Sequence, residues 1–156
     1  MGAVKVSAKA DYAVRAAAEL AAAQPGGAPL RAESIATAQG IPQRFLENIL
    51  SDLRHAGLVQ SVRGAEGGHK LNRPAGAITV ADVIRAVDGP LAAVRGERPE
   101  GVSYAGPAEP LQRVWIAVRK NLRDVVEHVT LEDLASGALP SGVDALADDP
   151  DAWQTR

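Results

Sequence analysis

The sequence contains no cysteine among its 156 residues. This absence excludes disulfides, thiolate nucleophiles, cysteine-ligated zinc and cysteine-held iron–sulfur clusters. Aromatic residues are only 3% of the chain, too few for the stacking platforms of proteins that bind single strands without sequence preference. No apolar run approaches the roughly 18 residues that span a bilayer, and the first residues lack the apolar stretch of a signal peptide. We therefore expect a soluble cytoplasmic protein with no membrane partner.

Alanine is abundant, with 30 residues, and this favours helices over sheets. The length is typical of one domain with one or two appendages. The net charge of −2 is unevenly distributed: residues 1–80 hold 9 Lys and Arg against 6 Asp and Glu, and residues 81–156 hold 8 against 13. The first half of the chain is therefore where a phosphate backbone would dock.

A helix-turn-helix is predicted between residues 32 and 56. The first helix ends at Gly40, which suits a left-handed C-cap, and Pro42 suits the first turn of the next helix. The apolar residues of the second helix form one stripe: Phe45, Leu46, Ile49, Leu50 and Leu53. Its opposite face carries polar residues able to reach base edges in a DNA major groove: Gln43, Arg44, Glu47, Asn48, Ser51 and Arg54.

A β-hairpin is predicted directly after this unit, with strands over residues 58–62 and 69–71. Its turn is rich in glycine, with Gly64, Gly67 and Gly68 following Arg63. Small residues let a backbone approach DNA closely, and a long cation can enter a minor groove. A hairpin in this position is a wing, and we expect its Arg63 to contact DNA. From spacing alone, the alternative is an ordinary solvated helix followed by a simple turn.

A long amphipathic helix is predicted from residue 109. Its apolar residues recur at spacings of 4, 3, 4, 3 and 4: Leu111, Trp115, Val118, Leu122, Val125 and Val129. This spacing is typical of a seam between two helices and predicts dimerisation. Ser7 precedes an alanine-rich helix over residues 8–20 as its N-cap, and Thr79 and Thr130 can cap two shorter helices.

These elements predict a mainly α fold with a small β-hairpin wing. Residues 1–90 form a winged helix-turn-helix DNA-binding domain, 91–108 a loop, 109–136 a dimerisation helix and a short terminal helix, and 137–156 a disordered acidic tail. Arg95, Arg98 and Tyr104 either line an effector pocket in the loop or serve only as linker residues. No nucleophile–base pair, metal-ligand spacing or phosphate loop points to an enzyme.

Several segments together resemble the Rrf2 family of bacterial winged-helix transcription regulators. The resemblance rests on residues 7–13 (SAKADYA), 41–47 (IPQRFLE), 56–71 (AGLVQSVRGAEGGHKL) and 87–90 (VDGP), in order within residues 3–135. It implies a homodimer in which the two long helices cross. This dimer would bind a palindromic promoter site in double-stranded DNA. By position, it implies phosphate contacts near Ser7 and Lys9, base reading by Gln43, Arg44 and Glu47, and minor-groove contact by Arg63. We also expect Lys70 to neutralise phosphates, together with Arg15 and Arg73.

The chain departs from many members of this family in its loop. Those members hold an iron–sulfur cluster with cysteines between the Asp-Gly-Pro segment and the long helix, and residues 91–110 contain none. We therefore expect no cofactor and a resemblance to the cluster-free branch, in which regulators of cysteine metabolism are known and a small molecule or a partner protein supplies the signal. The resemblance implies a repressor of sulfur, cysteine or iron–sulfur genes. The alternative is a winged-helix protein-interaction module without an operator, favoured by the small positive charge of residues 1–80.

Overall fold

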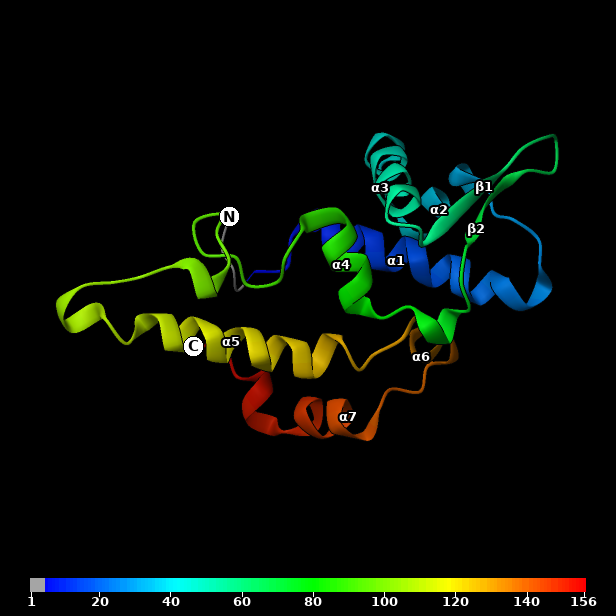
Figure 1. Ribbon diagram of the computed structural model, residues 1–156. Coiled ribbons are helices and arrows are strands. Elements are labelled where there is room, and N and C mark those ends of the chain that lie inside the picture. Colours follow the sequence, from blue (N-terminus) through cyan, green and yellow to red (C-terminus); the bar gives the residue numbers. More distant parts are fainter. Residues whose placement is uncertain (1–4) are drawn as a thin grey trace.

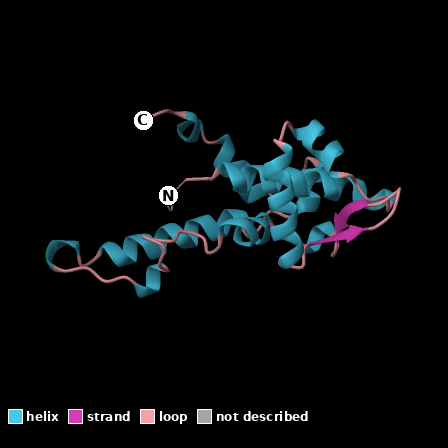
Figure 2. Cartoon of the chain, turned by 90° about the horizontal axis from the view of Figure 1, so that it is seen from above, coloured by secondary structure: helices cyan, strands magenta, loops and turns pink. Residues whose placement is uncertain are grey.

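The computed structural model describes residues 5–156, which form helices and one two-stranded antiparallel hairpin. This confirms the predicted fold class. The elements in chain order are α1 (Ala8–Ala23), α2 (Ala32–Gln39), α3 (Gln43–His55), β1 (Val59–Val62), β2 (Gly68–Leu71), α4 (Val80–Asp88), α5 (Leu111–Val126), α6 (Leu131–Ser136) and α7 (Ser141–Asp148). The hairpin and the loop before α5 lie at opposite ends of the molecule (Figures 1 and 2).

The hydrophobic core forms around α1. Its alanines Ala13, Ala16 and Ala17 are fully buried, and their small side chains let α1 approach α3, α4 and α6 closely. The predicted stripe of α3 supplies the other side of the core through Leu46, Ile49, Leu50 and Leu53. Because these four side chains face α1, the polar face of α3 points away from the core.

The turn between α2 and α3 has the geometry predicted from Gly40. This residue adopts φ 63°, in the left-handed region, and the amide of Ile41 donates to the carbonyl of Ala36 at 3.0 Å. Pro42 is the residue before the first turn of α3, one position earlier than expected. Since Ile41 is buried, the turn fixes the orientation of α3 relative to α2.

The hairpin is joined to the segment before α2. Val59 pairs with Leu71 and Val62 with Gly68, while Leu30 and His69 exchange two backbone hydrogen bonds of 2.7 and 2.8 Å. A Cβ on Gly68 would lie 2.4 Å from the carbonyl oxygen of Leu30, so only glycine permits this close approach. The hairpin is therefore attached to the helix-turn-helix at its base.

The chain returns to the core after α5. The amide of Val80 donates to the carbonyl of Val129 at 2.8 Å, and the amide of Leu131 donates to the carbonyl of Ile78 at 2.9 Å. Thr79 and Thr130 lie opposite each other, and each caps its helix, as predicted. Both caps are capping boxes. Leu131 is fully buried, so α6 closes the core that α1 began.

The last segment differs from the expectation of a disordered tail. Residues 141–148 form α7, which begins after Pro140, and the indole of Trp153 donates to the carbonyl of Ala147 at 2.5 Å. Proline is favoured at a helix start, and the indole satisfies a carbonyl at the C-terminal end that would otherwise lack a partner. No helix within residues 5–156 is long and apolar enough to cross a membrane.

Candidate nucleic-acid interface

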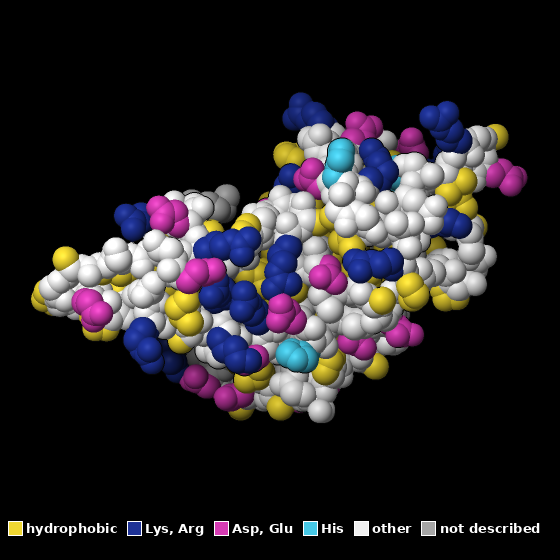
Figure 3. Space-filling model, viewed as in Figure 1, with side chains coloured by type: hydrophobic (Ala, Val, Ile, Leu, Met, Phe, Trp, Pro, Cys, Tyr) yellow, Lys and Arg dark blue, Asp and Glu magenta, His cyan; other side chains and the backbone are white. Residues whose placement is uncertain are grey.

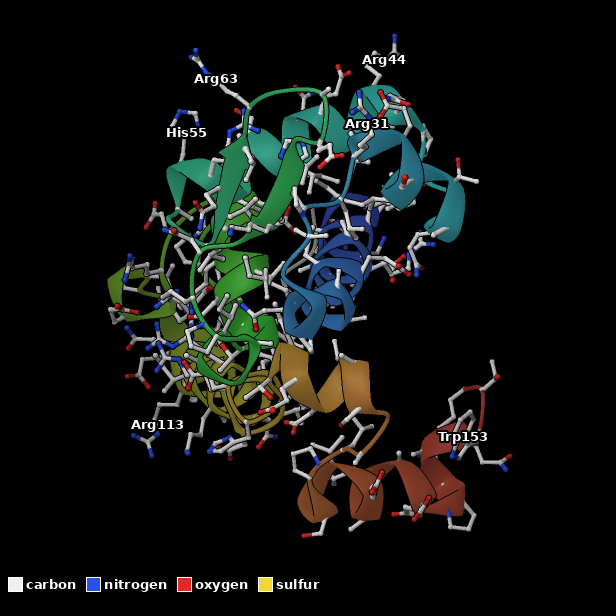
Figure 4. The ribbon with its side chains drawn as sticks, turned by 90° about the vertical axis from the view of Figure 1, so that its right-hand side faces the viewer. Arg31, Arg44, His55, Arg63, Arg113 and Trp153 are labelled. Atoms are coloured by element: carbon white, nitrogen blue, oxygen red, sulfur yellow. The ribbon has the colours of Figure 1, made fainter. Side chains whose placement is uncertain are left out.

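The polar face of α3 is exposed along its length. Gln43, Arg44, Glu47, Asn48 and Arg54 are exposed, and Ser51 is half-buried. Side chains three and four residues apart share a helix face, so this surface presents donors and acceptors in one row. In Figure 4, Arg44 projects outward from one end of the molecule, whereas Arg113 lies at the other.

The hairpin loop adds a second cation at this end. Arg63, Gly64, Ala65 and Glu66 are exposed, and Arg63 points outward on the same side as Arg44 (Figure 4). Gly67 is buried, and a Cβ there would lie 2.1 Å from the carbonyl oxygen of Val62. The loop is therefore tightly folded at its base while its tip is open to a partner.

Arg31, which no sequence pattern marks as a functional residue, holds this loop. Its Nη1 donates to the carbonyl of Ala65 at 3.0 Å, and its Nε lies 3.8 Å from Glu33. Arg31 precedes α2, so this bond joins the start of the helix-turn-helix to the tip of the hairpin. Sequence offers no signal for a contact between residues 34 positions apart.

Basic side chains occur in two regions of the surface, at the α3 and hairpin end and along α4 and α5 (Figure 3). Three of those in the second region are paired: Arg85 with Glu127 at 2.5 Å, Arg119 with Glu100 at 2.5 Å, and Lys120 with Asp124 at 2.6 Å. Within residues 5–156, neither Arg44 nor Arg63 takes part in an ion pair. Arg44 and Arg63 are therefore free to meet phosphates or bases, as is the exposed Arg113 on α5 at the other end of the molecule.

Two of the residues expected to contact phosphates, Ser7 and Lys9, have side-chain partners within the chain. Ser7 caps α1 by accepting from the amide of Ala10 at 2.9 Å, and its hydroxyl donates to Asp88 at 2.5 Å. Lys9 Nζ lies 2.7 Å from the carboxylate of Asp52 on α3. Lys9 thus lies beside α3 and Ser7 beside the end of α4, and each must exchange or share its partner before it can contact DNA.

The other basic residues expected at phosphates differ in their surroundings. Arg15 stacks over Tyr12 at 4.9 Å, pairs with Asp11 at 3.1 Å and donates to the carbonyl of Gln39 at 2.6 Å. It therefore has a structural role in joining α1 to α2. Lys70 is half-buried on β2, and Arg73 is exposed.

His69 lies in the base of the hairpin with its ring partly buried. Burial is the main cause that lowers the pKa of His69, the Arg54 guanidinium lowers it further, and Glu33 opposes the shift. Its Nδ1 is buried without a hydrogen-bond partner among the described residues. A neutral imidazole therefore fits this position better than a charged one.

Phe45 departs from the predicted apolar stripe. Its side chain is 50% exposed, whereas the other four stripe residues are buried. It lies at the edge of a surface hollow between α1 and α3, together with Lys9, Asn48, Ser51 and Asp52. Phe45 is at the margin of the stripe, about 90° from its centre at 100° per residue, so a helix that packs on the centre of the stripe leaves it partly uncovered.

The long helix α5 packs against the loop that precedes it. The indole of Trp115 donates to the hydroxyl of Tyr104 at 3.1 Å, and Gln112 donates to the carbonyl of Pro99 at 3.3 Å. Tyr104 thus contacts the helix, while Arg95 and Arg98 are exposed. An effector pocket in this loop stays a hypothesis.

The predicted seam is partly available for a second copy of the chain. Five of its members are half-buried: Leu111, Trp115, Val118, Leu122 and Val125. Val129 differs, because it lies beyond the end of α5 and is buried in the core of its own subunit. Val114, which the seam pattern omits, is 50% exposed.

Three comparisons relate this chain to known proteins. The sequence matches the family model Rrf2, described as an iron-dependent transcriptional regulator, over residues 6–137. A Mycobacterium tuberculosis protein named as an HTH-type transcriptional regulator is 49% identical over 146 residues, which are 94% of this chain and 90% of that protein. The regulator CymR of Bacillus subtilis is 39% identical over 134 residues, 85% of this chain and 91% of CymR.

Solved structures give the same relationship. CymR, described as the global cysteine regulator of B. subtilis, superposes with a TM-score of 0.72 at 38% identity, covering 86% of this chain and 98% of CymR. The IscR protein of T. potens superposes with a TM-score of 0.66 at 33% identity, covering 98% of this chain and 93% of IscR.

The iron in the family description does not fit the residues present. The sequence has no cysteine, and residues 5–156 contain no group of three or more His, Asp or Glu side chains that could hold a metal ion. The fold, the regulators among its relatives and the family match agree on the class of protein. The chain belongs to the Rrf2 family of DNA-binding transcriptional regulators with a winged helix-turn-helix fold.

Proposed function

We propose that this chain acts in the cytoplasm as a homodimeric repressor that binds a palindromic promoter site. The observation that carries the proposal is the pair Arg44 and Arg63, which project from the same end of the molecule on different elements (Figure 4). Both lack ion-pair partners among the described residues, and both elements are attached to one core. This arrangement suits one cation in the major groove and one in an adjacent minor groove.

In this proposal α3 reads base edges in the major groove. Arg44 suits guanine, which displays two acceptors, and Gln43 and Asn48 suit adenine, which displays a donor and an acceptor. Each good bidentate contact contributes roughly 1–3 kcal/mol of discrimination. Glu47 can only accept, so it pairs with a cytosine amine and disfavours bases that present acceptors.

The hairpin inserts Arg63 into the minor groove. A narrow minor groove has an enhanced negative potential that attracts arginine, so this contact reads DNA shape. The glycines Gly64, Gly67 and Gly68 keep the loop slim enough to approach the backbone. Lys9, Ser51, Arg54, Lys70 and Ser7 line the surrounding surface and supply phosphate contacts.

A second copy of the chain packs along α5. Its half-buried apolar residues and the exposed Val114 become buried when two such helices cross. Dimerisation places two α3 helices and two hairpins on one duplex, so the operator has two related half-sites. A dimer on a promoter excludes polymerase, which is the basis of repression.

The regulated genes belong to sulfur, cysteine or iron–sulfur metabolism. Support comes from CymR, described as a global cysteine regulator and similar over most of this chain. Because this chain has no cysteine, the signal comes from a small molecule or a partner protein that binds the dimer.

The first test is genome-wide enrichment of DNA with the tagged protein, followed by footprinting of the strongest site. We expect a palindromic site in a promoter, and Arg63→Ala should lower affinity for it by roughly 1–3 kcal/mol at fixed salt. Arg113→Ala is the matched control, since Arg113 is an exposed arginine at the opposite end of the molecule (Figure 4). Enrichment no higher than background would instead favour a protein-interaction module without an operator.

A further inference from the structure

The exposed ring of Phe45 is the feature of α3 that DNA phosphate contacts do not explain. It is 50% exposed on a helix whose four other stripe residues are buried. The other large apolar side chains of the described residues that are exposed lie outside α3: Val6, Val114, Leu139, Leu146 and Trp153. Phe45 instead lies in the first turn of α3, next to Arg44.

The ring of Phe45 packs against an aromatic ring of α1. The centroid of the Tyr12 ring lies 6.2 Å away at an interplanar angle of 40°, a favourable aromatic arrangement. Tyr12 is in turn covered by the guanidinium of Arg15 at 4.9 Å, and Arg15 is fixed by its bond to Gln39. The ring of Phe45 is thus positioned by α1 while half of its side chain is exposed.

Asn48 lies three residues further on and borders the same hollow as Phe45. Residues three apart are neighbours on a helix surface, so an apolar ring and a primary amide stand side by side. An A·T pair presents a complementary pair of groups in the major groove: the N6 and N7 of adenine, which suit an amide, and the C5-methyl of thymine. The thymine methyl is the apolar group that base pairs display in this groove.

We propose that Phe45 contacts the C5-methyl group of a thymine and that Phe45 and Asn48 together select an A·T pair. This inference rests on the proposed DNA-reading role of α3 and names one of its specificity-determining residues. The neighbouring charge favours this occupant over an apolar protein partner, because Arg44 precedes Phe45 and its exposed guanidinium attracts the phosphates beside the base. The two charged residues that border the hollow, Lys9 and Asp52, are paired with each other.

The test removes only the methyl group. Duplexes enriched by the full-length protein from a random pool define its motif, and each thymine is then replaced, one at a time, by deoxyuridine. At one thymine per half-site we expect uracil to weaken binding of the unmodified protein by about three- to tenfold, the effect of losing a methyl from an apolar contact. Phe45→Ala should bind the thymine and uracil duplexes equally.

Leu146→Ala is the matched control, because it removes another exposed apolar side chain and should discriminate as the unmodified protein does. If the unmodified protein is indifferent to uracil at every position, or Phe45→Ala keeps the discrimination, the Phe45 contact is refuted while the operator stands. The first of these outcomes needs no variant, so a failure of Phe45→Ala to fold leaves the test intact. If no motif is enriched, both proposals fall and Phe45 becomes the candidate contact for a protein partner.

Discussion

Lys9 and Asp52 form an ion pair of 2.7 Å between α1 and α3. Both side chains are more than a third exposed, so the pair itself contributes only about 0–1 kcal/mol to stability. The larger consequence of this pair is for the charge on the surface of α3. Asp52 places a carboxylate on the flank of the helix that we propose enters DNA, and it neutralises a lysine expected at phosphates.

Asp52→Asn should therefore strengthen DNA binding. Lys9 is released, one more phosphate is neutralised, and a repelling charge is removed. Titrations at several salt concentrations should show a plot of log affinity against log salt that is steeper by about 0.9. Asp124→Asn is the matched control, because it breaks the Lys120 pair on α5 with the same change in net charge. A slope that changes equally in both variants would contradict a local role for Lys9.

Arg31→Ala should loosen the hairpin tip. The bond from Arg31 to the carbonyl of Ala65 is lost, and such a bond contributes about 1 kcal/mol. Hydrogen exchange at residues 63–67 should become faster, and affinity for the operator should fall about fivefold at unchanged salt dependence. Glu33→Gln removes the 3.8 Å ion pair of Arg31 and leaves the loop bond in place, so it should leave hydrogen exchange at residues 63–67 unchanged. Unaltered exchange in Arg31→Ala would mean that the loop is held by its glycine-rich base alone.

Leu122→Glu should yield monomers. The residue lies midway along α5 and is half-buried, and a carboxylate there would be desolvated when two helices pack together. Sedimentation velocity should show the monomer, and operator affinity should fall by about two orders of magnitude because the two half-sites are no longer bound together. Asn121→Glu adds the same charge at the adjacent exposed position and should remain dimeric. A persistent dimer in Leu122→Glu would exclude the α5 seam as the interface.

The stability of the folded chain should fall as pH drops below about 6.5, and His69 should account for part of the loss. Burial lowers the pKa of His69 in the folded state beneath the ordinary histidine value of 6.5. Between these two pKa values the unfolded chain binds more protons than the folded one, so acid favours unfolding.

Urea unfolding at pH 7.5 and pH 5.5 measures this effect. The unmodified protein should lose more free energy of unfolding between these two pH values than His69→Gln, which cannot titrate at this position. His128→Gln is a suitable control, since His128 is exposed. Equal losses in all three proteins would show that His69 does not couple folding to protons.

The order of the helices and strands and the family could be predicted from the sequence. Three local features of the sequence predict the backbone conformation: the period of the α3 stripe, Gly40 at the turn and the glycine-rich loop after Val62. Each depends only on residues close together in the chain. The same locality explains why the polar face of α3 was identified residue by residue. The family resemblance, now confirmed by the match over residues 6–137, uses these segments in order.

Tertiary packing determines which of these side chains are exposed and which have partners within the chain. Phe45 fits the apolar period, yet it is exposed because α1 covers the middle of the stripe and not its margin. Ser7 and Lys9 have partners at Asp88 and Asp52, which lie far along the chain, and Arg31 reaches a loop that no local pattern connects to it. Periodicity assigns a face to a side chain, but the packing of distant segments decides whether that face is covered, paired or open to DNA.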